Sequence, residues 1–174
     1  YIPVDEEHPT QPLQAYGREK LAGEEAVLAL AEQAVVLRLA GIYGPDRHSG
    51  AVYNFIRAIS ERRPLEIAED RAVDMLYVED AAAAVLDALQ EQGVSGVYNV
   101  GFGQSLRLSA LAVEIGQLLG AEPNLLRGSG GSEFYMDTAK ARAAWSFAPR
   151  SHRLALRSYI DWIAASEEGT KYGG

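Results

Sequence analysis

The chain contains no cysteine in 174 residues. This absence excludes disulfides, thiolate nucleophiles, zinc–thiolate sites and cysteine-ligated clusters, and it favours a reducing compartment, so we expect a cytoplasmic protein. Histidine is also scarce, since His8, His48 and His152 are scattered and lack metal-ligand spacing. We therefore expect surface histidines and no metal site.

Positive charge is in short supply. The 16 Lys and Arg face 24 Asp and Glu, which gives a formal net charge of −8 and disfavours broad attraction to nucleic acid or anionic membranes. Uninterrupted apolar runs are missing too, because the most apolar region, Ala26 to Tyr43, is broken by Glu32 and Arg38 well short of the roughly 18 residues of a membrane span. The sequence predicts a soluble protein with neither a nucleic-acid nor a membrane partner.

Hydrophobic residues make up 48% of the chain and charged residues 23%, enough apolar surface for the core of one globular unit. A helix is predicted from about 13 to 33, followed by the β-branched run 35–39, which is typical of a buried strand in a parallel sheet. Further helices are expected at 51–61, 80–93, 109–120 and 151–166, and further strands at 65–67, 74–78 and 97–100. This alternation predicts an α/β fold.

Helical spacing of apolar residues predicts which helix faces are buried. In the helix at 80–93 the predicted buried face is Ala82, Val85, Leu86 and Leu89, and in the last helix it is Leu156, Tyr159, Ile160 and Ile163. Asp80 and Ser109 are predicted to cap the helices that follow them. Trp145 and Phe147 are expected to seat the C-terminal segment in the core.

Tyr16 and Lys20 are four residues apart on the first predicted helix, so their side chains share one face. A lysine ammonium near a phenol favours the phenolate, which allows the tyrosine to exchange a proton with a substrate hydroxyl. Alone, the pair is a weak signal, because an exposed tyrosine and lysine on a solvated helix face would look the same.

Further segments, in chain order, resemble those of one known family. They are Pro12–Glu24, which contains Tyr-x-x-x-Lys and a Glu four residues later; Leu37–Pro45, read as L-R-L-A-G-I-Y-G-P; Asp74–Ala82, with Tyr-Val-x-Asp; Val97–Gly101, with Tyr-Asn-x-Gly; and Asp137, Lys140, Ala141 and Pro149. Together they resemble the extended short-chain dehydrogenases/reductases, specifically the NAD-dependent epimerase/dehydratase group that acts on nucleotide sugars. The resemblance covers nearly all 174 residues.

The family's Gly-rich strand–turn–helix, which receives the dinucleotide pyrophosphate, has no counterpart here. Gly101-Phe102-Gly103 is no substitute, because the next residues do not complete G-x-G-x-x-G. The resemblance therefore implies an α/β fold made of the C-terminal part of a Rossmann-like parallel sheet plus a small substrate-binding lobe, with the Gly-rich N-terminal half absent. Residues 1–174 are expected to form a single partial domain in which the two parts interleave.

The resemblance also implies roles for individual residues. Tyr16 would act as general acid/base toward a sugar hydroxyl, while Lys20 would bind the nicotinamide ribose and hold Tyr16 partly ionised. Tyr43, Gly44 and Pro45 would form a loop beside the nicotinamide, although a Gly-Pro turn that merely ends a strand is the alternative. The implied cofactor is NAD or NADP.

Arginines bind the substrate diphosphate in this family, as suits bidentate contact with phosphate. Arg127, ten residues before Asp137, lies near the family spacing for one of them. The position of a second is occupied by Val73, with Arg71 two residues earlier. Arg71 could reach the same phosphate from an offset strand or could be a solvated surface arginine.

The implied function is an NAD(P)-dependent nucleotide-sugar epimerase or dehydratase, of which this chain is a C-terminal fragment. One alternative is a catalytically silent fragment or a partner-binding remnant that lacks the cofactor, and another is a reductase of a different carbonyl substrate. The resemblance further implies a homodimer, formed in part by the helix that contains Tyr16. The sugar, the base and the choice between NAD and NADP stay open.

Overall fold

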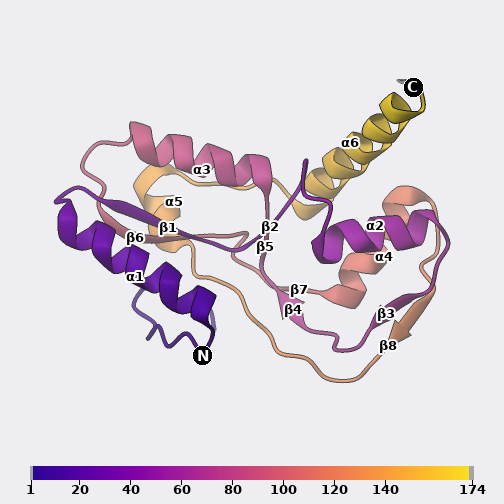
Figure 1. Ribbon diagram of the computed structural model, residues 1–174, viewed down its shortest axis with the longest axis horizontal. Helices are drawn as coiled ribbons and strands as arrows, with labels where there is room; N and C mark the ends of the chain where they lie inside the picture. Colours follow the sequence, from indigo (N-terminus) through magenta and orange to yellow (C-terminus); the bar gives the residue numbers. More distant parts are fainter. Residues whose placement is uncertain (1, 173–174) are drawn as a thin grey trace.

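The computed structural model describes residues 2–172, and the side chains of residues 2–166. It forms two adjacent lobes (Figure 1). The sheet lobe contains α1 (Ala15–Leu30), β1 (Val35–Leu39), α3 (Val78–Gln90), β6 (Gly96–Val100) and α5 (Ala139–Trp145). The small lobe contains α2 (Gly50–Ser60), β3 (Leu65–Ile67), α4 (Leu108–Leu119), β8 (Leu125–Arg127) and α6 (His152–Tyr172). Between them lie β2 (Gly41–Tyr43), β4 (Ala72–Val73), β5 (Met75–Tyr77) and β7 (Leu106–Arg107).

Parallel strand pairs run through both lobes. β1 pairs with β6 over its whole length, β2 pairs with β5, and β3 pairs with β8, all in parallel. β4 and β7 form a short antiparallel pair. The predicted α/β class with parallel strands is confirmed.

Each lobe has its own hydrophobic core. In the sheet lobe, Ala84, Tyr98 and Val100 pack with Trp145 and Phe147, which confirms the predicted place of the last two. The core of the small lobe brings together α2, α4 and α6, and its most buried side chains include Ile56, Leu111, Ile115, Leu156 and Tyr159. All four predicted core positions of the last helix are buried.

The longer elements lie where the periodicity predicts them, with shifts at their ends. The first helix is shorter than expected, and α3 begins two residues earlier, at Val78. The sequence reasoning missed five short elements, β2, β4, β7, β8 and α5. Segments of two to seven residues are too short to establish a helical or strand period.

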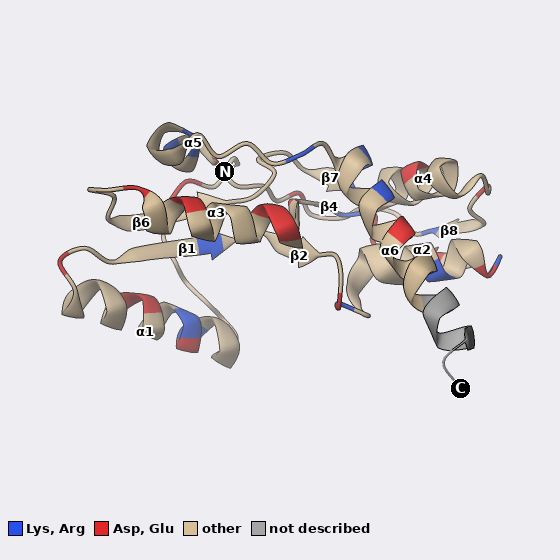
Figure 2. Cartoon of the chain, turned by 90° about the horizontal axis from the view of Figure 1, so that it is seen from above, with Lys and Arg blue, Asp and Glu red and all other residues tan. Residues whose placement is uncertain are grey.

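The predicted buried face of α3 is wrong. The helix buries Ala81, Ala84 and Ala88, while Ala82 is exposed and Val85, Leu86 and Leu89 are 40%, 57% and 77% exposed. Small side chains let the helix backbone lie close to β1, β2 and β5, whereas the larger residues point away from this contact. In Figure 2 the ribbon of this helix is tan for most of its length, with red only where its acidic residues lie.

The two predicted helix caps are also wrong. Asp80 lies inside α3, where its carboxylate accepts hydrogen bonds from the backbone N–H and the Nε of Arg150 at 3.2 and 2.8 Å. Ser109 lies inside α4 and donates its hydroxyl to Asp70 at 2.7 Å. Each side chain therefore bonds to a residue far away in the sequence, and neither caps the backbone of its own helix.

Candidate functional site

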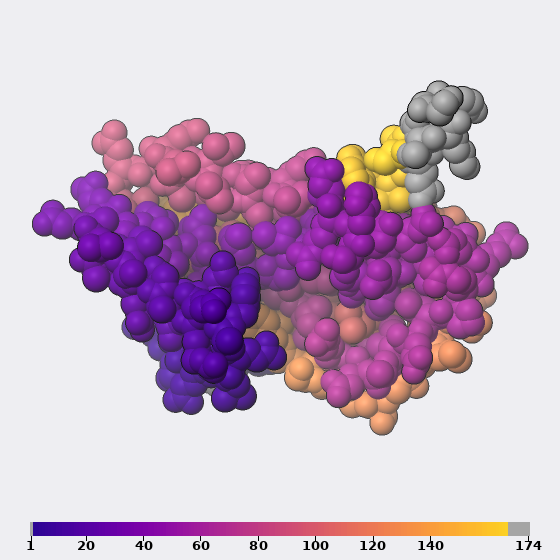
Figure 3. Space-filling view, viewed as in Figure 1, coloured from indigo at the N-terminus to yellow at the C-terminus, as the bar shows by residue number. Residues whose placement is uncertain are grey.

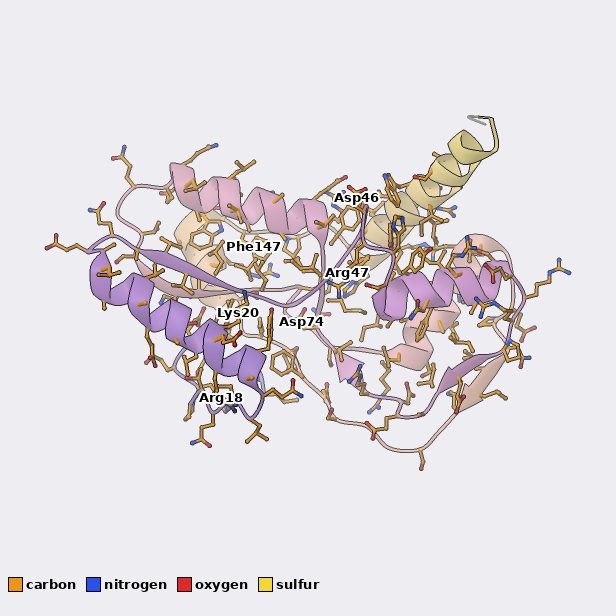
Figure 4. The ribbon with its side chains drawn as sticks, viewed as in Figure 1. Arg18, Lys20, Asp46, Arg47, Asp74 and Phe147 are labelled. Carbon is orange, nitrogen blue, oxygen red and sulfur yellow. The ribbon has the colours of Figure 1, made fainter. Side chains whose placement is uncertain are left out.

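Tyr16 and Lys20 meet on one face of α1, as predicted. The Lys20 Nζ lies 5.4 Å from the centroid of the Tyr16 ring, within the range of a cation–π contact. Tyr16 is 69% exposed, so solvent and ligands can reach its hydroxyl. Both residues line a groove of about 740 Å³ between α1 and β1, and Figure 4 shows Lys20 on the side of α1 nearer the sheet.

A polar contact attaches α1 to the sheet. None of the fully described residues 15–30 is buried, so the helix has little apolar anchorage. Arg38 on β1 donates from Nε and Nη2 to the Glu24 carboxylate on α1, and from Nη1 to the carbonyl of Glu6 at 3.0 Å. The arginine and the glutamate belong to the motifs quoted above, and the structure shows them as partners.

Tyr43 lies in the core rather than in an open site. It is 5% exposed, and its ring lies 5.6 Å from that of Tyr77 and 6.2 Å from that of Tyr159. Burial raises the pKa of its hydroxyl strongly, and this oxygen has no hydrogen-bond partner within the described part of the chain. A cofactor contact of this loop would therefore come from backbone atoms or from the partly exposed Pro45, and not from the Tyr43 hydroxyl.

Gly44 explains how the chain turns directly after Tyr43. Its φ is +141°, and a Cβ at this position would lie 2.5 Å from the Cγ1 of Val78. Only glycine avoids both the unfavourable backbone conformation and this collision. The Gly-Pro sequence thus has a structural role whether or not the loop touches a cofactor.

Arg71 and Arg127 belong to adjacent segments of the small lobe. Arg127 ends β8 opposite Ile67, and the next residue, Gly128, donates its N–H to the Ile67 carbonyl at 2.8 Å. Gly131 lies directly against the backbone of Arg71. Both arginines are exposed.

A third arginine, Arg107, lies in the same region and was missed from the sequence. Its Nη1 donates to the Asp70 carbonyl at 2.9 Å. Hydrogen bonds from Ser109 hold the pKa of the Asp70 carboxyl below its usual value. The positive charges of Arg107 and Arg127 lower this pKa further. The region therefore combines several cations with one carboxylate.

Two buried polar residues near the lobe junction were also missed. Asp74 is 2% exposed and accepts three backbone hydrogen bonds, and Asn99 is 2% exposed and donates from Nδ2 to the Val4 carbonyl at 2.9 Å. A signal existed for Asp74, since a lone carboxylate at the start of the strand predicted at 74–78, between the apolar residues Val73 and Met75, must find partners when it is buried.

Within the described residues, no group of three or more His, Asp or Glu side chains is arranged to hold a metal ion. Among the same residues, no helix combines the length and apolar character needed to cross a bilayer.

Residues 2–164 match the family described as the RmlD substrate binding domain. The chain belongs to this family. The resemblance drawn from the sequence motifs, to short-chain dehydrogenase/reductase enzymes of nucleotide sugars, is thereby confirmed at the level of the family.

Curated relatives of this RmlD-type chain include reductases of dTDP-linked sugars. It is 30% identical over 170 residues to a probable dTDP-4,6-dihydroxy-2-methyloxan-3-one 4-ketoreductase of Streptomyces antibioticus, covering 95% of this chain and 56% of the relative. It is 27% identical over 168 residues to a dTDP-4-dehydrorhamnose reductase of Mycolicibacterium smegmatis, covering 95% and 50%. The chain thus spans about half the length of these relatives.

A solved structure with the same fold is that of MoeE5 in complex with UDP-glucose and NAD. The TM-score is 0.82 and the sequence identity 26%, over 94% of this chain and 60% of that one. This similarity agrees with the prediction that the parallel sheet is part of a Rossmann-like fold.

Proposed function

We propose that the protein containing this chain is an NAD(P)H-dependent reductase of a keto sugar linked to a nucleoside diphosphate, with a dTDP-linked 4-keto sugar as the first candidate. The observation that carries the proposal is the Tyr16–Lys20 pair on the exposed face of α1. The names of the dTDP-sugar reductases among the relatives support this choice of substrate.

The residues present fit the nicotinamide-ribose end of such a cofactor. Lys20 offers an ammonium group with three donors on the wall of an open groove, which suits the neighbouring hydroxyls of a ribose. The Tyr16 hydroxyl is reachable from the same groove. When bound, the reduced nicotinamide supplies a hydride.

Tyr16 completes the proposed reduction by moving a proton. As the carbonyl carbon gains the hydride, the carbonyl oxygen becomes an alkoxide and takes the proton of the Tyr16 hydroxyl. The Lys20 ammonium stabilises the phenolate left on Tyr16, which regains a proton from solvent because its side chain is exposed. One carbonyl would thus become one hydroxyl, with the hydride supplied by the bound cofactor and the proton by Tyr16.

Arg127, together with Arg71, is proposed to hold the substrate diphosphate. Both guanidinium groups are exposed and come from segments that lie side by side in the small lobe. This arrangement supports a site in which the sugar reaches Tyr16 on the sheet lobe while the diphosphate stays on the small lobe. In Figure 3 the surface is indented between the indigo N-terminal segment and the small lobe.

A nucleotide-sugar epimerase is the second candidate, in line with the epimerase or dehydratase implied by the motifs. The observation that favours it is the presence of UDP-glucose and NAD together in the similar MoeE5 structure. In an epimerase Tyr16 would first take a proton from the sugar hydroxyl and later return it, so NAD(P)H would not be consumed.

The homodimer expected from the sequence stays a prediction. Two exposed apolar side chains support it: Leu13, just before α1, is 92% exposed, and Leu30, the last residue of α1, is 87% exposed. Sedimentation of the wild type and of Leu30→Glu would test it, because a charge in the interface should shift a dimer toward monomer.

The test of function uses the full-length protein with dTDP-4-keto-6-deoxyglucose and NADPH or NADH. We expect oxidation of one NAD(P)H for each sugar reduced, and loss of turnover in Tyr16→Phe with nucleotide binding retained. Interconversion of UDP-glucose without net oxidation would instead support the epimerase. A folded protein that binds neither cofactor nor nucleotide sugar would support the silent remnant.

A further inference from the structure

The chain passes repeatedly between the sheet lobe and the small lobe. Two of these crossings contain strands, namely residue 40 with β2, and β5. The other three are the segments 101–106, 133–136 and 148–151. Because the lobes have separate hydrophobic cores, these crossings determine how one lobe is oriented relative to the other.

Asp74, the residue directly before β5, contacts several crossings at once. Its Oδ1 accepts the N–H of Phe102 at 2.8 Å, and its Oδ2 accepts the N–H groups of Gly103 and Met136, both at 3.1 Å. Its backbone carbonyl accepts the N–H of Gly41 at 3.3 Å. Figure 4 shows Asp74 between the two lobes.

The geometry leaves the carboxylate little freedom. Asp74 is 2% exposed, and a Cβ added to Gly101 would lie 2.7 Å from Oδ2, so the space beside the carboxylate is filled. Three N–H donors converge on its two oxygens, and these donors match an ionised carboxylate, which is acceptor-only. In Asp74→Asn, the NH₂ group of the neutral amide would face at least one of these N–H donors, so that hydrogen bond would be lost.

Stability alone is a poor explanation for this buried charge. Burial raises the pKa of the Asp74 carboxyl even though the three backbone N–H groups act in the opposite direction. Desolvation of this charge opposes folding, and what the carboxylate supplies in return is one acceptor for three N–H groups from two crossing segments.

We propose that Asp74 is a positioning residue that fixes the small lobe, with Arg71 and Arg127, relative to the Tyr16–Lys20 pair on the sheet lobe. The inference rests on the proposed function, in which one substrate contacts both lobes. A misplacement of about 1 Å between a reacting group and its substrate can lower the rate about a hundredfold. The junction therefore controls turnover although Asp74 touches no reacting atom.

The experiment compares Asp74→Asn with Asp137→Asn in the full-length protein. Asp137 is a matched control, since its carboxylate also accepts a backbone N–H, that of Ala139 at 2.8 Å, but this bond joins neighbouring residues of one segment in the sheet lobe. In Asp74→Asn we expect kcat/KM for the dTDP-linked keto sugar to fall about 10- to 100-fold. The affinity for dTDP, whose diphosphate is proposed to bind Arg71 and Arg127 on the small lobe, should stay within about twofold of wild type.

A second readout measures lobe geometry without any substrate. Spin labels at Glu25→Cys on α1 and Leu126→Cys on β8 report the distance between the lobes. Both positions are exposed, and residues 1–174 contain no other cysteine. We expect a narrow distance distribution in wild type and Asp137→Asn, and a broader or displaced one in Asp74→Asn.

The outcomes separate the two proposals. If wild type reduces no nucleotide-linked sugar, the proposed function fails, and the spin-label distances still decide whether Asp74 fixes the lobes. Equal losses of dTDP affinity and turnover, or an unchanged distance distribution in a folded Asp74→Asn variant, would overturn the role of Asp74. Asp74→Ser, which keeps a small oxygen acceptor, replaces Asp74→Asn if that variant does not fold.

Discussion

Arg38 on β1 and Glu24 on α1 are joined by two N–H···O bonds, from Nε to Oε2 at 3.1 Å and from Nη2 to Oε1 at 2.5 Å. The Arg38 side chain is 22% exposed and that of Glu24 is 14% exposed, so this ion pair is partly shielded from water. Because α1 buries none of its residues 15–30, the pair is a main attachment of the helix that presents Tyr16 and Lys20.

We predict a coupling free energy of about 1–2 kcal/mol between Arg38 and Glu24, since charge-assisted bonds shielded from solvent are stronger than exposed ones. A double-mutant cycle with Arg38→Gln and Glu24→Gln, followed by urea unfolding, measures it. The exposed pair Arg63–Glu61, joined at 2.6 Å, is the control and should show no measurable coupling. Additive effects at Arg38 and Glu24 would contradict the prediction.

Arg127→Ala should weaken the binding of dTDP by about 1.5–3 kcal/mol, as expected when a charged hydrogen bond to phosphate is lost. Arg71→Ala should have a similar effect if its guanidinium reaches the same diphosphate from the neighbouring segment. Arg62→Ala, which removes an equal charge from the exposed turn that follows α2, is the control. Titration calorimetry with dTDP measures the affinity of all three variants. Unchanged affinity in Arg127→Ala would show that Arg127 does not bind the diphosphate.

The sequence predicted the longer elements and the Tyr16–Lys20 contact because both depend on local spacing. Helical periodicity alone places Tyr16 and Lys20 on one face of α1, whatever the rest of the fold does. It cannot show which residues meet across the lobes, and for this reason the contacts of Asp74 with Phe102 and Met136 were missed.

The error on α3 has a related cause. The sequence pattern favours the face with the largest apolar residues, but the distance between helix and sheet decides which face fits. Ala84 is 0% exposed and Leu89 is 77% exposed, the reverse of what side-chain size suggests. The burial of Tyr43 also depends on tertiary packing and could not be predicted from local spacing. Its hydroxyl has no hydrogen-bond partner among the described residues.

Substitutions on α3 test this corrected orientation. Ala84→Leu should destabilise the protein by about 1–3 kcal/mol, because the new side chain has no room against the sheet. Leu89→Gln should change the free energy of unfolding by less than about 0.5 kcal/mol, as is usual for surface substitutions. Urea unfolding measures both, and the opposite order of effects would mean that the predicted face was right.

Gly44→Ala should destabilise the fold by about 1–3 kcal/mol, because the alanine would adopt a strained φ and collide with Val78. Gly23→Ala is the matched control. Gly23 lies inside α1 with no atom within 4 Å of an added Cβ, so alanine there should stabilise the helix by about 0.5–1 kcal/mol. Thermal unfolding of both variants checks the prediction, and a harmless Gly44→Ala would show that the loop relaxes.

His152 is largely buried and not at the surface as the sequence predicted, and it should make stability depend on pH. Its ring packs on Phe102 with centroids 3.8 Å apart, its Nε2 has no hydrogen-bond partner among the described residues, and burial lowers its pKa below the usual 6.5. The unfolded chain therefore binds a proton at a higher pH than the folded chain does. The contribution of His152 is complete above about pH 6.5 and is lost as the pH falls from there toward its lower folded-state pKa.

His152→Phe preserves the ring contact and removes the titration. We expect its free energy of unfolding to match that of wild type at pH 8, where both rings are neutral, and to fall less steeply than that of wild type below about pH 6.5. Chemical unfolding at several pH values measures the two slopes. Parallel curves would show that the folded protein accommodates the imidazolium, for example by opening the contact with Phe102, and that His152 contributes nothing to the acid sensitivity of the lobe junction.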